Sequence, residues 1–282
     1  MLQKKINKYY LTFLILLHTG LSQEYLPSSQ ISLSRVRENR DFSPDLIASY
    51  TNQLMFVDKK NHTIGIYSND SLRIAGGYGS SEYSLMDPVD IFIDNLVIMV
   101  LDESAGRVSK FDLNLNFIQL YNLKSNDPIY SEVFDIDSRQ NIYFYSAEDG
   151  ILYRRRNVTQ KAVKFIDYNL NSSSNCVSDI FINNADQIGV LFDCKGELHI
   201  YGRSGRLQRK YKVDLENPAK IFFLNDDWAV INSDANIEFL NGSVRSLFTD
   251  KEVLVDAYLD QNRLLILTKN NIYIFDSSII SK

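Results

Sequence analysis

Six apolar segments recur along the chain at nearly constant spacing. They begin at Met55, Ile98, Ile142, Ile188, Trp228 and Leu264, so successive starts lie 43, 44, 46, 40 and 36 residues apart. The most complete unit spans residues 76–118, where Gly, Pro, Asn and Asp turns separate four short strands. A period of about 40 residues with four strands per unit is typical of a β-propeller. The sequence therefore predicts an all-β fold, a six-bladed propeller with four-stranded antiparallel blades.

The last unit is one strand short. Only seven residues follow the strand expected at residues 272–275. A replacement is available at the other end of the chain, where residues 30–37 alternate in polarity as a strand does. We predict that this N-terminal strand pairs beside residues 272–275 and closes the ring. The alternative is an N-terminal arm outside the propeller.

The second unit carries a more specific motif. It contains Pro88-Val-Asp-Ile-Phe-Ile-Asp, then Ile98-Met-Val-Leu-Asp, then Gly106-Arg-Val-Ser-Lys-Phe-Asp. This order resembles the NHL repeat of six-bladed propellers. The first unit keeps part of the motif, and the other four keep its hydrophobic pattern. The resemblance implies the fold and leaves the function open, because this propeller serves enzymes and binding modules alike.

The N-terminus reads as an export signal. Residues 1–22 combine a basic start, a short apolar run and small residues just before position 23, as a signal peptide does. The apolar run is about ten residues long, whereas a bilayer-spanning helix, the alternative, needs roughly 20. We expect a signal peptide at residues 1–22, a tether at residues 23–29 and one propeller at residues 30–282.

The net charge narrows the range of partners. The chain has 30 Lys and Arg against 35 Asp and Glu, and loss of three leader lysines with no acid changes its charge from −5 to −8. Nucleic-acid binding is not expected, because phosphate contacts need clustered Lys and Arg. We predict a monomer that is exported to the periplasm, the cell surface or the medium, with no transmembrane segment in the mature chain.

The two cysteines, Cys176 and Cys194, are predicted to form a disulfide, which export favours. If residues 177–183 and 187–193 form a hairpin centred on Ala185, paired residue numbers sum to 370, and the cysteines obey this rule. Opposed residues in such a hairpin have Cβ atoms about 4.5 to 5.5 Å apart, near the distance that a disulfide needs.

Acidic residues recur near the start of the innermost strands. The corresponding positions are Leu46, Asp90, Asp135, Asp179, Lys220 and Asp256. Because these strand starts meet at one mouth of the central channel, the four aspartates are candidate ligands for a metal ion such as Ca²⁺. The alternative is that each aspartate satisfies nearby backbone amides, in which case no cofactor is expected.

Basic residues gather beside the predicted outer strands of the third and fourth units. On an acidic chain they are a candidate surface for an anionic partner, such as phospholipid head groups or an acidic protein. The alternative is that they protect strand edges from aggregation. The residues are Arg154, Arg155, Arg156, Arg203, Arg206, Arg209, Lys210 and Lys212.

Other features point to binding more than to catalysis. Only His62 and His199 remain after leader removal, without metal-type spacing. Tyr78 and Tyr83 lie in a long connection, where amphipathic rings suit a protein or peptide partner, with core packing as the alternative. We predict a non-catalytic binding or scaffolding propeller that engages a protein or envelope partner. The alternative is a lactonase-like or lyase-like propeller enzyme with a metal at the channel mouth.

Overall fold

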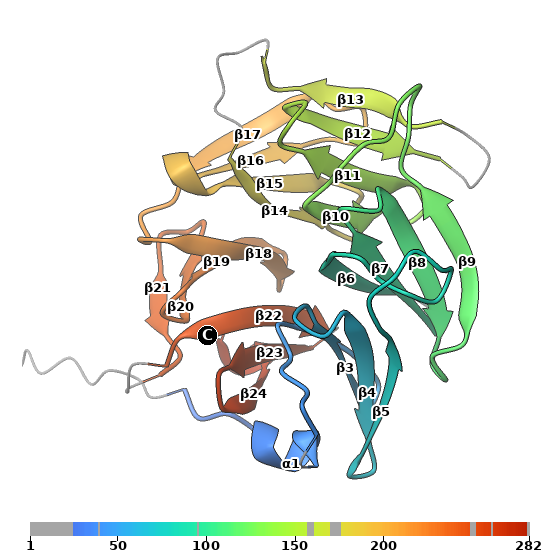
Figure 1. Ribbon diagram of the computed structural model, residues 1–282. Coiled ribbons are helices and arrows are strands. Elements are labelled where there is room, and N and C mark those ends of the chain that lie inside the picture. The colour runs from blue at the N-terminus through green and yellow to red at the C-terminus, as the bar shows by residue number, and fades with distance from the viewer. Residues whose placement is uncertain are drawn as a thin grey trace, which may run out of the picture.

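The chain forms a ring of six β-sheets. The computed structural model describes residues 25–280 except 39, 95, 157–160, 170–175, 249–251 and 261. Within these residues, six four-stranded sheets surround a central axis (Figure 1). The prediction of an all-β, six-bladed propeller is confirmed. The proposed signal peptide lies outside the described residues and stays a prediction.

The strands of each blade run outward from the central channel in chain order, except in the sixth blade, where β1 is outermost. The innermost strands are β2 (Leu46–Tyr50), β6 (Pro88–Asp94), β10 (Val133–Ile136), β14 (Val177–Ile182), β18 (Pro218–Leu224) and β22 (Leu254–Asp260). The second strands are β3 (Gln53–Asp58), β7 (Val97–Asp102), β11 (Ile142–Ser146), β15 (Ile188–Phe192), β19 (Asp227–Asn232) and β23 (Arg263–Thr268).

The two outer positions of each blade complete the sheets. The third strands are β4 (Thr63–Ser68), β8 (Arg107–Asp112), β12 (Ile151–Arg155), β16 (Glu197–Tyr201), β20 (Asn236–Phe239) and β24 (Asn271–Asp276). The outermost strands are β5 (Ser71–Gly76), β9 (Phe117–Asn122), β13 (Val163–Asp167), β17 (Leu207–Lys212), β21 (Val244–Ser246) and β1 (Ser29–Ser32). We call the side where the innermost strands begin the front face, and the opposite side the back face.

The core lies between neighbouring blades. Every residue of the second strands β11 and β15 is buried, because a blade covers each face of these sheets. Strands that are covered on both faces carry continuous apolar runs instead of alternating ones. This double burial explains why the six apolar segments were the clearest repeat in the sequence.

The N-terminal segment closes the ring, as predicted. β1 pairs antiparallel with β24 and places Ile31 opposite Ile272. The predicted length was wrong, because Leu33–Arg37 forms a short helix, α1. Leu33 and Val36 are both buried between the sixth and first blades. In a strand, side chains three residues apart would point to opposite faces, whereas one helical turn directs both into the core.

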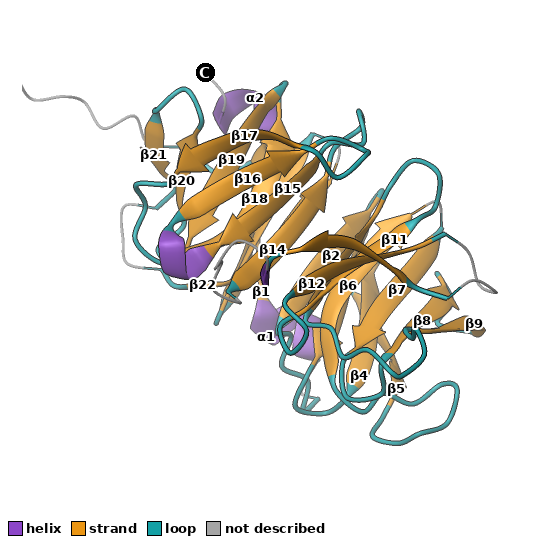
Figure 2. Ribbon diagram, turned by 90° about the horizontal axis from the view of Figure 1, so that it is seen from above, coloured by secondary structure: helices purple, strands orange, loops and turns teal. Residues whose placement is uncertain are grey.

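Helices are confined to short segments beside the strands (Figure 2). Besides α1, the helices that lie wholly within the described residues are the 3₁₀ turn η2 (Asp193–Lys195) and α2 (Ser277–Ile280). In the described part of the chain, no helix is long and apolar enough to cross a bilayer.

The disulfide between Cys176 and Cys194 is confirmed, with a Cα–Cα distance of 5.9 Å. The predicted pairing rule holds from Ile182 opposite Ile188 to Asp179 opposite Leu191, and a bulge then shifts the register by one residue. The bond therefore joins the ends of the hairpin just beyond its regular pairs. A disulfide that closes a loop of this size stabilises a fold by about 3 kcal/mol.

Removal of the closing segment should destabilise the propeller. A chain that begins at Asp41 loses the β1–β24 pairs and the buried Leu33 and Val36, and these two side chains alone contribute about 4 kcal/mol. We expect the melting temperature to fall by roughly 10 °C relative to a chain that begins at Gln23, as measured by circular dichroism. A chain that begins at Pro27 keeps the segment and should melt like the chain that begins at Gln23. Equal melting of all three chains would contradict closure by this segment.

Candidate functional site

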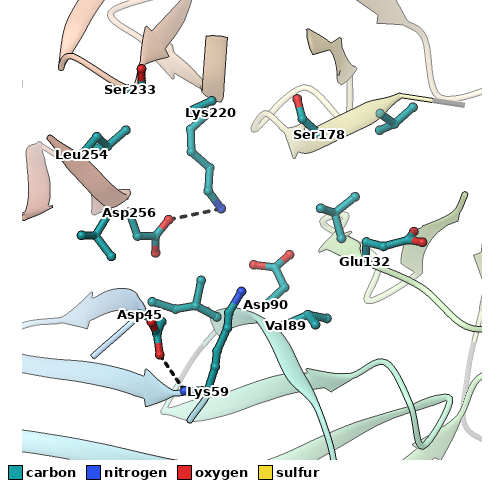
Figure 3. Close-up of a pocket in the computed structure, with 15 residues that line it drawn as sticks. Asp45, Lys59, Val89, Asp90, Glu132, Ser178, Lys220, Ser233, Leu254 and Asp256 are labelled. Atoms are coloured by element: carbon teal, nitrogen blue, oxygen red, sulfur yellow. Dashed lines mark hydrogen bonds and ion pairs between the residues drawn. The ribbon is translucent and has the colours of Figure 1, made fainter. Parts of the chain in front are cut away.

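The central channel contains two cavities. The front cavity, of about 430 Å³, is lined by residues at the starts of the innermost strands and in neighbouring turns (Figure 3). The back cavity, of about 420 Å³, is lined by later residues of five innermost strands. Asp90 and Lys220 line both cavities, so a charged layer lies between them. Both volumes lie at the low end of the range for small-ligand sites.

Local β-bulges shape the front cavity. In β6, β14, β18 and β22 the register shifts near the first residues, so that one residue has no cross-strand partner. These residues are Val89, Ser178, Ala219 and Val255, and all four line the front cavity. A bulge re-aims side chains at such a position. The residues that follow the four bulges are Asp90, Asp179, Lys220 and Asp256, which form the charged layer.

Asp135 does not occupy the position predicted for it. β10 has no bulge, and Val133 opposes Tyr145 much as Asp90 opposes Leu101 in β6. Val133 therefore corresponds to Asp90, and Asp135 lies two residues further toward the back. Consistent with this register, Val133 lines the front cavity and Asp135 lines the back cavity.

Each of the four aspartates accepts a hydrogen bond from the innermost strand of the next blade. The inner edge of these strands faces the channel and has no further strand to pair with, so an N–H group there needs another acceptor. The bonds run from Phe134 to Asp90 (3.1 Å), from Ile182 to Asp135 (2.5 Å), from Ile221 to Asp179 (2.7 Å) and from Ile47 to Asp256 (2.8 Å).

Lys220 supplies a cation to the charged layer. Its Nζ lies 3.4 Å from Oδ1 of Asp256 and 3.7 Å from Oδ1 of Asp179, and Figure 3 shows the side chain reaching toward Asp256. The two carboxylates are buried, and the lysine side chain is 23% exposed. The layer therefore carries its own compensating charge.

Burial sets the protonation of these groups. It raises the pKa of Asp179 to about 7, although Lys220 and the Ile221 amide oppose the shift. Burial likewise raises the pKa of Asp90 and of Asp135. For Lys220, burial disfavours the charge, but the attraction of Asp256, Asp179 and Asp90 outweighs it and raises the pKa.

The aspartates do not form a compact set of metal ligands. Among the described residues, the only three acidic, cysteine or histidine side chains with ligand atoms within 4.8 Å of one another are Cys176, Asp193 and Cys194, two of which form the disulfide. The four predicted ligands share the channel but do not converge on one point.

The predicted basic residues fall into two groups. Arg155 is buried, lies over the Tyr121 ring and donates to the Asn122 carbonyl, so it does not belong to a surface. Arg154 is half-buried over the Phe165 ring. The other six residues line the outside of the two blades. They are Arg156, Arg203, Arg206, Arg209, Lys210 and Lys212.

Lys59 and Glu132 are among the front-cavity residues that the sequence analysis did not identify. Lys59 lies in the turn that follows β3, and Glu132 directly precedes β10. Neither recurs from unit to unit, so a search for repeated positions could not select them.

Comparisons with solved structures agree on the fold. A catalytically inactive variant of virginiamycin B lyase from Staphylococcus aureus, with quinupristin, is similar with a TM-score of 0.62 and 13% identity over 88% of this chain and 99% of that one. The extracellular domain of a one-component system from B. thetaiotaomicron is similar with a TM-score of 0.63 and 9% identity, over 90% of this chain and 43% of that one. The WD40 propeller domain of Doa1 is similar with a TM-score of 0.58 and 13% identity, over 90% of this chain and 97% of that one.

At these identities the similarity shows the fold alone. No protein-family model matches the chain, and no curated protein matches its sequence. The NHL resemblance is therefore supported as far as a six-bladed propeller.

Loss of the Lys220 charge should destabilise the protein in a pH-dependent way. Lys220→Met leaves the carboxylates of Asp179 and Asp256 buried without a cation, which should cost about 3 kcal/mol at pH 8. The folded-state pKa of Asp179 lies above its ordinary value, so folding favours the protonated form and the cost should shrink as the pH falls from 7 toward 4. Urea unfolding at several pH values measures both effects.

Lys59→Met is the matched control, because Lys59 lines the same cavity and forms no ion pair with a described residue. Its stability should stay within about 0.5 kcal/mol of the parent chain. A pH-independent loss in Lys220→Met, or no loss, would contradict the proposed role of the lysine.

Proposed function

We propose that this chain is an exported, non-catalytic propeller that binds a protein or peptide partner on the rim of its front face. The observation that carries this proposal is the internal use of the channel carboxylates. All four predicted aspartates accept backbone N–H groups, and two of them also pair with Lys220. Groups that hold blades together are poorly placed to act as acids, bases or metal ligands.

The front rim offers apolar side chains to a partner. Tyr78, Tyr130 and Val253 are 72%, 43% and 62% exposed and lie in the connections that lead to β6, β10 and β22. Tyr83, in the same connection as Tyr78, is 63% exposed. Exposed tyrosines are enriched in protein interfaces, because their rings supply contact area with one polar end.

Export is supported by two observations. The Cys176–Cys194 disulfide fits an oxidising compartment. A similar propeller forms the extracellular domain of a bacterial one-component system. The signal-peptide pattern of residues 1–22 and the NHL-like motif of the second unit fit the same proposal.

The second candidate is a lyase-like or lactonase-like enzyme with Ca²⁺ held by Asp90, Asp135, Asp179 and Asp256. The fold similarity to virginiamycin B lyase favours it. However, that lyase is inactivated by a histidine-to-alanine replacement, and the two histidines of the described chain line neither cavity. His199 instead contacts Glu197 and Tyr201 on the third strand of its blade.

The third candidate is attachment to an anionic surface through the outside of the third and fourth blades. β17 exposes Arg209, Lys210 and Lys212. Lys210 already pairs with Glu197 at 2.8 Å, which reduces the charge available to a partner. Binding to anionic vesicles that disappears in high salt would favour this candidate over the rim.

The proposal is tested by capture of a partner from the envelope of the host. The immobilised mature chain should retain a partner, and Tyr78→Ser combined with Tyr130→Ser should reduce the retained amount about tenfold, a loss of about 1.4 kcal/mol. Leu207→Ser, which removes an exposed side chain from the outer edge, is the control and should change nothing.

The proposal would be contradicted if the rim substitutions left the retained amount of partner unchanged. Stoichiometric Ca²⁺ in the purified protein, together with a melting temperature that falls after chelation, would favour the enzyme instead.

A further inference from the structure

The front cavity contains polar groups that the fold leaves unused. The backbone N–H of Lys59 donates a hydrogen bond to the Asp45 carboxylate at 2.8 Å. The side-chain ammonium of Lys59, however, has no carboxylate of a described residue within ion-pair distance. Figure 3 shows this side chain pointing into the cavity from the side opposite Lys220. Ser178 Oγ is buried, lines the same cavity and has no hydrogen-bond partner among the described residues.

Buried polar atoms without a partner are uncommon, since each costs about 1 to 3 kcal/mol. The hydroxyl oxygen of Ser178 is shielded from solvent, so bulk water cannot readily compensate it. Together with the Lys59 ammonium at the same cavity, this group points to a bound molecule with polar groups of its own.

The cavity presents both charge signs. Lys59 contributes a positive charge that attracts Glu103 but forms no ion pair with a described residue, whereas the charge of Lys220 is shared with two aspartates. Asp90 and Glu132 line the same cavity and contribute negative charge. Their oxygens accept backbone N–H groups, from Phe134 at 3.1 Å and from Ala147 at 3.1 Å, but an ionised carboxylate has room for further donors.

Apart from Asp45 and Ser233, the rest of the lining is aliphatic. The front cavity takes its apolar wall from residues on all six innermost strands. They are Leu46, Val89, Val133, Val177, Ala219, Leu254 and Val255. No aromatic ring lines this cavity among the described residues, so neither a flat base nor a sugar finds a stacking surface there. A compact aliphatic group fits these walls.

We propose that the front cavity binds a free α-amino acid with an aliphatic side chain. The ligand's carboxylate pairs with Lys59, its ammonium lies toward Asp90 and Glu132, and its side chain packs against the valines. This ligand site goes beyond the proposed function, because the partner contacts the rim and the amino acid lies inside.

Titration calorimetry with the mature chain tests this site. Leucine, valine or isoleucine should bind with a Kd of about 1 mM or tighter. Two analogues of leucine separate its charges: 4-methylpentanoate lacks the ammonium, and 3-methylbutylamine lacks the carboxylate. Each should bind at least about tenfold more weakly than leucine.

Two neighbouring lysines give a matched pair of variants. Lys59→Met should weaken leucine binding at least about tenfold. Lys60→Met should leave it unchanged, because the Lys60 side chain is 73% exposed and does not line the cavity. The melting temperature of each unliganded variant shows that it is folded.

Three results would overturn the inference: no heat with any of the three amino acids at about 10 mM, equal binding of 4-methylpentanoate and leucine, or equal effects of the two lysine substitutions. Partner capture does not depend on this site, so its success alongside any of these results would leave the proposed function in place.

Discussion

The hydrogen bond between an aspartate carboxylate and the innermost strand of the next blade holds the centre of this propeller together. A propeller packs sheets face to face, and its innermost strands leave one edge toward the channel without a partner strand. Four of the six junctions between blades place a carboxylate at that edge. At the junction from the fifth to the sixth blade, Lys220 pairs with Asp256 instead. At the junction from the first to the second, Leu46 contributes to an apolar cluster.

This arrangement explains why the channel is charged although its four aspartates do not cluster. The carboxylates point along the ring toward neighbouring amides, and their oxygens do not converge. Lys220 adds the positive charge that an acidic layer would otherwise draw from solution. The layer divides the channel into a front and a back cavity, and the front cavity keeps the unused groups, Lys59 among them. Asp90 holds the next blade and also lines the front cavity, whereas Lys59 lines the cavity without an ion pair to a described residue.

The features that could be predicted from the sequence are those that repeat in every blade or that depend on the geometry of a single hairpin. Six apolar second strands predicted six blades, because burial on both faces selects the same residue types in every unit. The missing outer strand predicted closure by the N-terminus, and hairpin symmetry predicted the disulfide. The sequence did not reveal the bulges, because an extra residue at a strand start depends on pairing with the neighbouring strand. Asp135 was aligned with Asp90, although Val133 holds the matching position, because the turn between the first two strands is longer in the third blade than in the second.

Other features depended on contacts distant in the chain. Leu33 and Val36 form a helical turn because both reach the core between the last and first blades. Arg155 is buried against Tyr121 from the preceding blade, so its place in a basic run gave no sign of its environment. Lys59 became a candidate ligand-binding residue only when its turn was seen to face the channel. These residues are not distinguished by their types or by periodicity.

Amide hydrogen exchange at the channel edge tests the central claim most directly. In the parent chain, the amides of Ile47, Phe134, Ile182 and Ile221 should be strongly protected, although no strand pairs with that edge. Asp179→Ala should speed exchange at Ile221 about tenfold or more, a loss of about 1.4 kcal/mol of local stability, and leave Val190 in the adjoining β15 unchanged. Exchange at Ile221 that is already fast in the parent chain, or that does not respond to Asp179→Ala, would contradict the account.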